Sequence, residues 1–126
     1  MGTWGAGNFD SDAALDYIGE VTGAIEARIE ACLADEDASA LDEDGEGVLM
    51  PSVALLSVLH EHCKAGPPKP EAVLRWKRQY LAIFDDQIDD LDPVPGYKEE
   101  RRAVIEGTFD RLAAQAADFW RDSESE

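Results

Sequence analysis

Apolar residues recur at steps of three and four positions in four separate segments of the chain, and this spacing predicts helices. The segments span residues 12–33, 51–65, 70–91 and 97–120. An α-helix turns once in about 3.6 residues, so this spacing places the apolar side chains on one stripe of each helix. No segment shows the strict alternation of apolar and polar residues that half-buried strands require. The sequence therefore predicts an all-α fold, a compact bundle of about four helices.

The predicted first helix has an acidic start and two internal glycines. An acid at Asp10 or Asp12 suits its start, because a carboxylate accepts hydrogen bonds from the unpaired N–H groups of the first turn. Gly19 and Gly23 lie four residues apart inside it, although glycine weakens a helix. Small residues at this spacing let another backbone come close, so we expect a packing contact there.

The length of 126 residues fits one ordinary domain. We expect residues 1–122 to form a single helical domain and residues 123–126 to be a frayed tail. Residues 34–47 (ADEDASALDEDGEG) are acidic and poor in apolar side chains, which predicts an exposed connector.

The charge balance limits the possible partners. The 28 Asp and Glu residues outnumber the 11 Lys and Arg residues, which gives a formal net charge of −17. Nucleic acids and anionic membranes need a basic footprint, so we expect neither as a partner. The charge favours a basic protein partner, or it serves solubility alone. The opening residues lack the basic and apolar regions of a signal peptide, and no apolar run is long enough to span a membrane, so we expect a cytoplasmic protein.

The densest group of acids is Asp85, Asp86, Asp89, Asp90 and Asp92. Its DDQID stretch matches the DDxxD pattern that prenyl-chain enzymes use to hold magnesium. Those enzymes have much longer chains and a second acidic motif. On a helical wheel Asp85 and Asp89 lie opposite Tyr80 and Phe84, which predicts a solvated face. The alternative is a site for Mg²⁺ or Mn²⁺, because acids in a last helical turn oppose the helix dipole and would attract a cation.

Other groups with reactive side chains predict no catalytic site. His60, His62 and Cys63 lie close together in sequence and could join Cys32 as ligands for a soft metal. However, Cys63 falls on an apolar stripe, and no third group is placed to orient a nucleophile. We therefore expect no cofactor and assign no catalytic residue.

The opening segment MGTWGAGNFDSDAALDYIGE resembles the start of bacterial proteins grouped as domain of unknown function 4259. Their pattern runs Met-Gly-x-Trp-Gly-x-Gly-x-Phe-x-x-Asp-x-Ala-x-Asp. The matching positions here are Met1, Gly2, Trp4, Gly5, Gly7, Phe9, Asp12, Ala14 and Asp16. Relatives often carry a carboxylate inside the apolar second helix, where this chain has Leu55, Leu56 and Ser57. The resemblance implies no activity, but it marks an ordered N-terminal loop as the feature to test.

Two interpretations of this loop remain open. In the structural one, Trp4 and Phe9 plug the bundle while nearby acids cap the first helix. In the functional one, the loop forms a rim that binds a basic or amine-bearing partner. The candidate binding residues are Trp4, Asn8, Phe9, Asp10, Asp12 and Asp16.

These observations favour a non-enzymatic, acidic protein-binding module, an immunity-like or antitoxin-like partner of a basic protein. The alternative is a small hydrolase or metal-binding protein that uses a divalent cation at residues 85–92. A homo-oligomer with a structural role is a third interpretation, and the sequence leaves the oligomeric state open.

Overall fold

The computed structural model describes residues 2–124, and the side chains of residues 2–121. The helices are α1 (Asp12–Ala34), α2 (Met50–Cys63), α3 (Pro70–Gln87) and α4 (Tyr97–Glu124). A π-helical segment, η1 (Leu41–Leu49), leads into α2, and a 3-10 turn, η2 (Ile88–Leu91), follows α3. Thr3 and Ser11 form an isolated β-bridge, and no strand occurs among the described residues. The predicted all-α bundle of four helices is confirmed.

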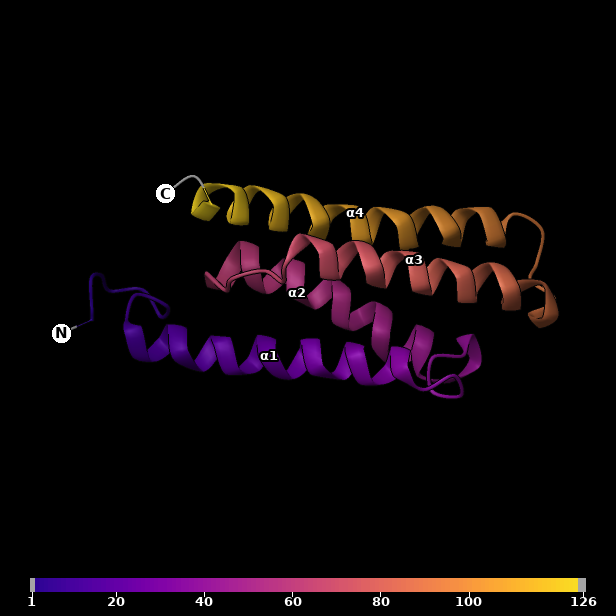
Figure 1. Cartoon of the computed structure of the whole chain (residues 1–126), viewed down its shortest axis with the longest axis horizontal. Helices are drawn as coiled ribbons and strands as arrows, with labels where there is room; N and C mark the ends of the chain where they lie inside the picture. The colour runs from indigo at the N-terminus through magenta and orange to yellow at the C-terminus, as the bar shows by residue number, and fades with distance from the viewer. Residues whose placement is uncertain (1, 125–126) are drawn as a thin grey trace.

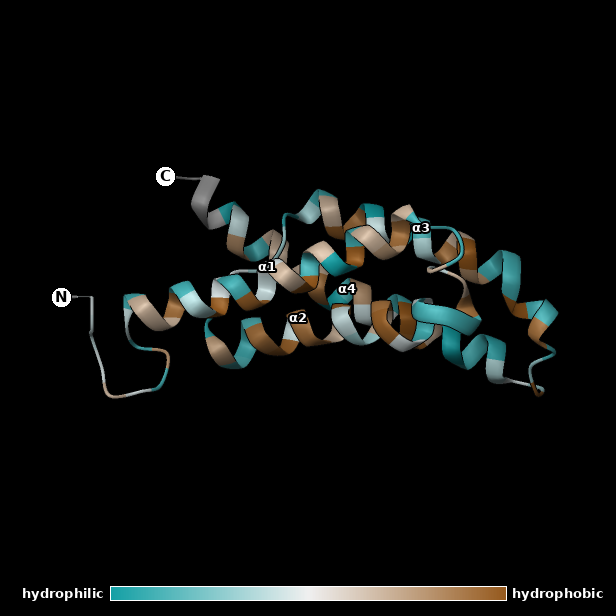
Figure 2. Ribbon diagram, turned by 90° about the horizontal axis from the view of Figure 1, so that it is seen from below, coloured by the Kyte–Doolittle hydropathy of each residue, from teal (hydrophilic) through white to brown (hydrophobic). Residues whose placement is uncertain are grey.

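The four helices lie side by side as a bundle (Figure 1). α4 packs against both α2 and α3, and α2 also packs against α1. The contact between α1 and α3 is the least extensive of these four helix–helix contacts. α1 and α4 therefore lie at opposite corners. In Figure 2 most helices show a hydrophilic and a hydrophobic side, whereas α2 is hydrophobic along most of its length. Each stripe faces the shared core, as the 3.6-residue period requires.

The core is built mainly from two helices. α3 contributes Trp76, Tyr80 and Phe84, and α4 contributes Ile105 and Phe109, all fully buried. Further fully buried side chains are Ile29, Leu49, Val53, Leu56, Val73 and Leu112. The spacing of the aromatic residues on α3 is four, so their rings lie one turn apart on the same side of the helix.

Four apolar residues of the predicted apolar stripes are exposed instead. Leu55, Val58, Leu91 and Val104 keep 48%, 42%, 48% and 49% of their surface in solvent. α2 is apolar on nearly every side, so its sequence does not identify which side faces the core. In the bundle α2 packs against α1 and α4, and Val58 and Val104 line an open hollow at the seam between α2 and α4.

The glycines inside α1 do not mark a packing contact. Gly19 and Gly23 are exposed, and a Cβ atom at either position would meet nothing within 4 Å. The expectation of a close helix contact at these positions is wrong.

Replacing Gly23 with alanine is therefore expected to raise the free energy of unfolding by about 0.5–1 kcal/mol, because alanine restricts the unfolded chain and fits the helix without strain. Urea unfolding followed by circular dichroism would measure the change. Gly45→Ala is the contrasting variant, since a Cβ there would lie 2.5 Å from the Ser39 carbonyl oxygen, and it should destabilise. A destabilised Gly23→Ala variant would mean that another surface covers this face.

The second half of the acidic connector is not the exposed loop that its composition predicts. Leu41 and Leu49 are buried, and the Leu41 N–H donates to the Gln87 side-chain oxygen at 2.9 Å. These apolar anchors hold η1 on the bundle despite its many acids. α4 continues to Glu124, so the first half of the predicted frayed tail is helical, while residues 125–126 lie outside the described part.

None of the helices within residues 2–124 combines the length and the apolar character needed to cross a membrane.

Candidate functional site

The N-terminal loop folds back on the start of α1. The Trp4 N–H donates to the Asp10 carbonyl oxygen at 3.0 Å, and the Asp12 N–H donates to the Gly2 carbonyl oxygen at 2.6 Å. These bonds flank the bridge between Thr3 and Ser11. The loop is therefore an ordered element closed by backbone hydrogen bonds, as the sequence predicts.

The glycines of the loop make room for two carboxylates. A Cβ atom on Gly5 or Gly7 would lie 2.5 or 2.6 Å from Asp10 Oδ2, and the Gly7 N–H donates to that oxygen at 2.9 Å. Gly2 has a positive φ of 72°, and a Cβ there would lie 2.2 Å from Asp12 Oδ2. Side chains at these positions would displace the carboxylates. The Gly-x-Trp-Gly-x-Gly pattern is thus explained by how tightly the backbone wraps Asp10 and Asp12.

Asp10 also ties the loop to the end of α2. Its carboxylate forms an ion pair with Lys64, a residue in the left-handed conformation just after α2. The hydrogen bond from Lys64, followed by that from the Gly7 N–H, lowers the pKa of Asp10. The residue that caps α1 is Ser11, whose hydroxyl accepts from the Ala14 N–H at 3.1 Å. The prediction that Asp10 or Asp12 caps this helix is therefore wrong.

The loop does not plug the core with its tryptophan. Trp4 is 54% exposed, and Phe9 is half-buried. Asn8, Asp12 and Asp16 are exposed as well. Of the six candidate binding residues, Asp10 holds the loop together, Phe9 is half-buried, and the other four are open to solvent. The loop and the first turns of α1 thus present an aromatic residue and two carboxylates on the surface.

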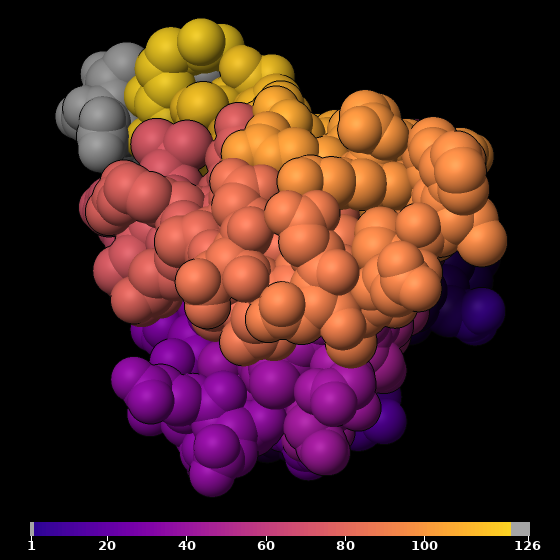
Figure 3. Space-filling view, turned by 90° about the vertical axis from the view of Figure 1, so that its right-hand side faces the viewer, coloured from indigo at the N-terminus to yellow at the C-terminus, as the bar shows by residue number. Residues whose placement is uncertain are grey.

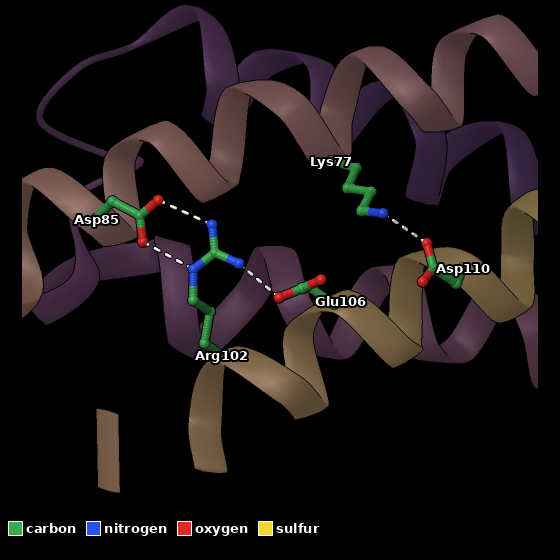
Figure 4. A network of polar contacts seen from close by, with 5 residues as sticks. All are labelled: Lys77, Asp85, Arg102, Glu106 and Asp110. Atoms are coloured by element: carbon green, nitrogen blue, oxygen red, sulfur yellow. Dashed lines mark hydrogen bonds and ion pairs between the residues drawn. The ribbon is translucent and has the colours of Figure 1, made fainter. Parts of the chain in front are cut away.

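The aspartates at the end of α3 face cations of α4. Both oxygens of Asp85 accept from Arg102 at 2.9 Å, and Arg102 also reaches Glu106 (Figure 4). The hydrogen bond from Arg102 lowers the pKa of Asp85. Asp89 forms an ion pair with Lys98 at 3.0 Å. These partners leave Asp86 and Asp90 as the remaining members of the predicted cation site.

The described residues contain no group of three or more His, Cys, Asp or Glu side chains placed to hold a metal ion. The candidate soft-metal ligands have separate environments. Cys32 is buried in α1, Cys63 is half-buried in α2, and His62 is exposed. His60 Nδ1 lies 2.8 Å from the Ala65 carbonyl oxygen and closes the turn after α2.

A polar network that sequence reasoning missed joins η1 to α3 and α4. The Tyr80 hydroxyl donates to Glu46 Oε2 at 2.6 Å, and Arg101 donates to both Glu46 oxygens at 2.8 and 2.9 Å. Burial opposes ionisation of Glu46, but the hydrogen bonds from Arg101 and Tyr80 outweigh it, so its pKa is lowered. Burial and the bond to Glu46 raise the pKa of Tyr80. Tyr80 and Arg101 lie far from Glu46 in the sequence, so the composition around Glu46 could not predict these contacts.

Most cations of the chain are already neutralised within it. Nine of the eleven Lys and Arg residues form ion pairs: Arg28, Lys64, Arg75, Lys77, Lys98, Arg101, Arg102, Arg111 and Arg121. Lys69 instead lies 3.6 Å above the centre of the Trp120 ring. The chain therefore has few cations left to balance the remaining acids.

Eight acids without such a partner lie in the connector and around the end of α3, at the end of the bundle that Figure 3 views directly, with the connector below the end of α3. We call this surface the acidic end. Its members, none of which forms an ion pair within residues 2–121, are Asp35, Glu36, Asp37, Asp42, Glu43, Asp86, Asp90 and Asp92. Carboxylates this dense produce a strong local negative potential.

Comparison with known proteins gives one match. The model of a family described as Domain of unknown function (DUF4259) matches residues 2–126. No curated protein and no solved structure matches the chain.

Proposed function

Because the chain belongs to the DUF4259 family, whose description names no activity, we propose from its surface that it is a non-enzymatic binding module for a basic protein. Small immunity and antitoxin-like proteins work in this way. The observation that carries the proposal is the acidic end, where eight carboxylates form no ion pair within residues 2–121 although Lys98 and Arg102 pair with neighbouring acids.

The physical basis is electrostatic steering. A concentrated negative potential attracts a basic surface before contact and raises the association rate, and salt weakens this attraction. A field spread evenly over the molecule would serve solubility equally well. A dense local group of unpaired carboxylates, such as the acidic end, also orients the partner, which favours a role in binding.

The N-terminal loop offers a second contact on the same molecule. Trp4 is exposed on a backbone held in place by hydrogen bonds, and exposed tryptophans are common anchors of protein interfaces. Asp12 and Asp16, which are exposed in the first turns of α1 after the loop, would attract cationic side chains. The loop therefore supports binding rather than catalysis.

The alternative is a hydrolase that depends on a divalent cation at the end of α3, and the ion pairs of that region argue against it. Asp85 and Asp89 are engaged by Arg102 and Lys98, and a cation would have to displace both. Such charge-assisted pairs compete directly with a metal for the same oxygens.

Affinity capture from native lysate, with the full chain tagged at its C-terminus, tests the proposed function. We expect one enriched basic protein whose association rate falls as the salt concentration rises. The Trp4→Ala variant, handled in parallel, tests whether the loop contributes. An association rate that does not respond to salt, or no captured basic protein at low salt, would contradict the proposal.

A further inference from the structure

The seam between α1 and α3 opens into a hollow near the acidic end. Glu30 of α1 joins the two helices, since its carboxylate accepts from Arg75 at 2.6 and 2.9 Å and from the Trp76 indole at 3.0 Å. Towards the end of α1 the helices leave a hollow of about 430 Å³. The residues that line it and matter here are Leu33, Glu36, Ala82, Ile83, Asp86 and Gln87.

The lining combines an apolar surface with acids on both walls. Leu33 and Ile83 are half-buried, so each still has apolar surface facing solvent. Glu36 lies in the connector after α1 and Asp86 on α3, so the two carboxylates come from opposite sides. Neither forms an ion pair with a cation within residues 2–121.

This combination matches one class of side chain. Lys and Arg have long aliphatic stems that pack on apolar surface, and charged heads that bind carboxylates. A purely aliphatic side chain would leave both carboxylates unmatched, and an acidic one would be repelled by them.

The walls of the hollow are fixed before any partner arrives. Gln87 uses its side-chain oxygen to accept from the Leu41 N–H at 2.9 Å, which ties the connector to α3. Asp35 accepts from the N–H groups of Asp37 and Ala38 at 3.0 and 3.2 Å, which fixes the turn that carries Glu36. A site built this way loses little conformational entropy when it is occupied.

We propose that this hollow is an anchor site for a Lys or Arg side chain of the basic partner. The inference rests on the proposed function and names where that partner is held. A second copy of this chain is a poor occupant, because a symmetric contact would bring two such acidic hollows together.

An acetylated and amidated tetra-arginine peptide, titrated into the ¹⁵N-labelled full chain at low ionic strength, tests the anchor site. We expect the largest amide shifts at Leu33, Ala82 and Ile83. The double variant Glu36→Gln/Asp86→Asn should bind the peptide about tenfold more weakly, because it loses two charge-assisted contacts. Ala82→Trp should weaken binding similarly by filling the hollow without changing the charge, with folding verified by circular dichroism.

The matched control is Glu99→Gln/Glu100→Gln, which removes the same charge from two exposed positions at the start of α4. It should change the affinity by less than about threefold, as expected for screened surface charges. Equal losses of peptide affinity in both double variants, with no loss in Ala82→Trp, would overturn the anchor site and leave the proposed function standing.

Failure of the peptide to bind the wild-type chain would also overturn the anchor site, whereas only the lysate capture decides the proposed function. Self-association of the wild-type chain that Ala82→Trp abolishes in sedimentation experiments would assign the hollow to a second copy, which contradicts the inference.

Discussion

Replacing Trp76 with alanine is expected to lower the free energy of unfolding by about 4 kcal/mol, the range measured when a buried tryptophan is truncated. Trp76 is 1% exposed and is the largest fully buried side chain of the core. Its removal leaves a cavity between helices, and its indole N–H no longer reaches Glu30 of α1 at 3.0 Å. Because domains of this kind are stable by only about 5–15 kcal/mol, the variant should melt far below the wild type.

The other two tryptophans provide matched controls for the same substitution. Trp120 is half-buried, with its indole N–H shared between the Pro67 and Pro68 carbonyl oxygens, so Trp120→Ala should cost about 1–2 kcal/mol. Trp4 is 54% exposed, so Trp4→Ala should stay within about 0.5 kcal/mol. Urea unfolding followed by far-ultraviolet circular dichroism avoids any dependence on the altered fluorophore. If Trp4→Ala proved as costly as Trp76→Ala, the loop would be part of the core.

The helices of this fold were predictable from the sequence because their signals are local. The stripe on α3 joins Trp76, Tyr80 and Phe84 at steps of four, and all three are buried. Ile105 and Phe109 repeat the pattern on α4. An amphipathic stripe identifies both the helix and its inner face, so no knowledge of the neighbouring elements was needed.

Where a helix lacks such contrast, the sequence identified the helix but not its inner face. α2 carries apolar residues all round, and two of them, Leu55 and Val58, remain exposed in the bundle. The misplacement of Trp4 has another origin. Its glycine-rich surroundings predicted an ordered loop correctly, but the shape of that loop is set by Asp10 and Asp12, which need the space around the glycines.

The candidate site was less predictable than the fold because its contacts join distant parts of the chain. Glu46 pairs with Tyr80 and Arg101, which lie 34 and 55 residues away. Composition alone assigned Glu46 to an exposed connector, because nothing in the sequence distinguishes it from the other acids of residues 34–47. The hollow between Glu36 and Asp86 is equally invisible in sequence, because only the packing of α1 and α3 brings these walls together.

Replacing Glu46 with alanine is expected to lower the free energy of unfolding by about 2–3 kcal/mol. The Tyr80 hydroxyl, on a fully buried residue, would lose its acceptor, and Arg101, 23% exposed, would lose both of its charge-assisted bonds. Removing one partner of such a pair leaves the other desolvated and unmatched, which costs more than the pair itself contributes. Chemical unfolding at pH 7 measures this loss.

The ionised form of Glu46 should also make stability depend on pH. Its pKa is lowered in the folded chain, so its contribution is complete above the unfolded value of about 4.3 and is lost as the pH falls through the folded value. Glu46→Gln keeps the shape but removes the charge. The stability difference between the wild type and this variant should therefore be largest near pH 7 and shrink below about pH 4.

Glu43 supplies the control, because it lies in the same π-helical segment and is exposed. Glu43→Ala should change the free energy of unfolding by less than about 0.5 kcal/mol at any of these pH values. If Glu46→Ala and Glu43→Ala were equally mild, η1 would not be held by the network, and the buried Leu41 and Leu49 alone would anchor it. If the difference in free energy of unfolding between wild type and Glu46→Gln stayed constant with pH, the folded chain would not favour the ionised form of Glu46 over the protonated form.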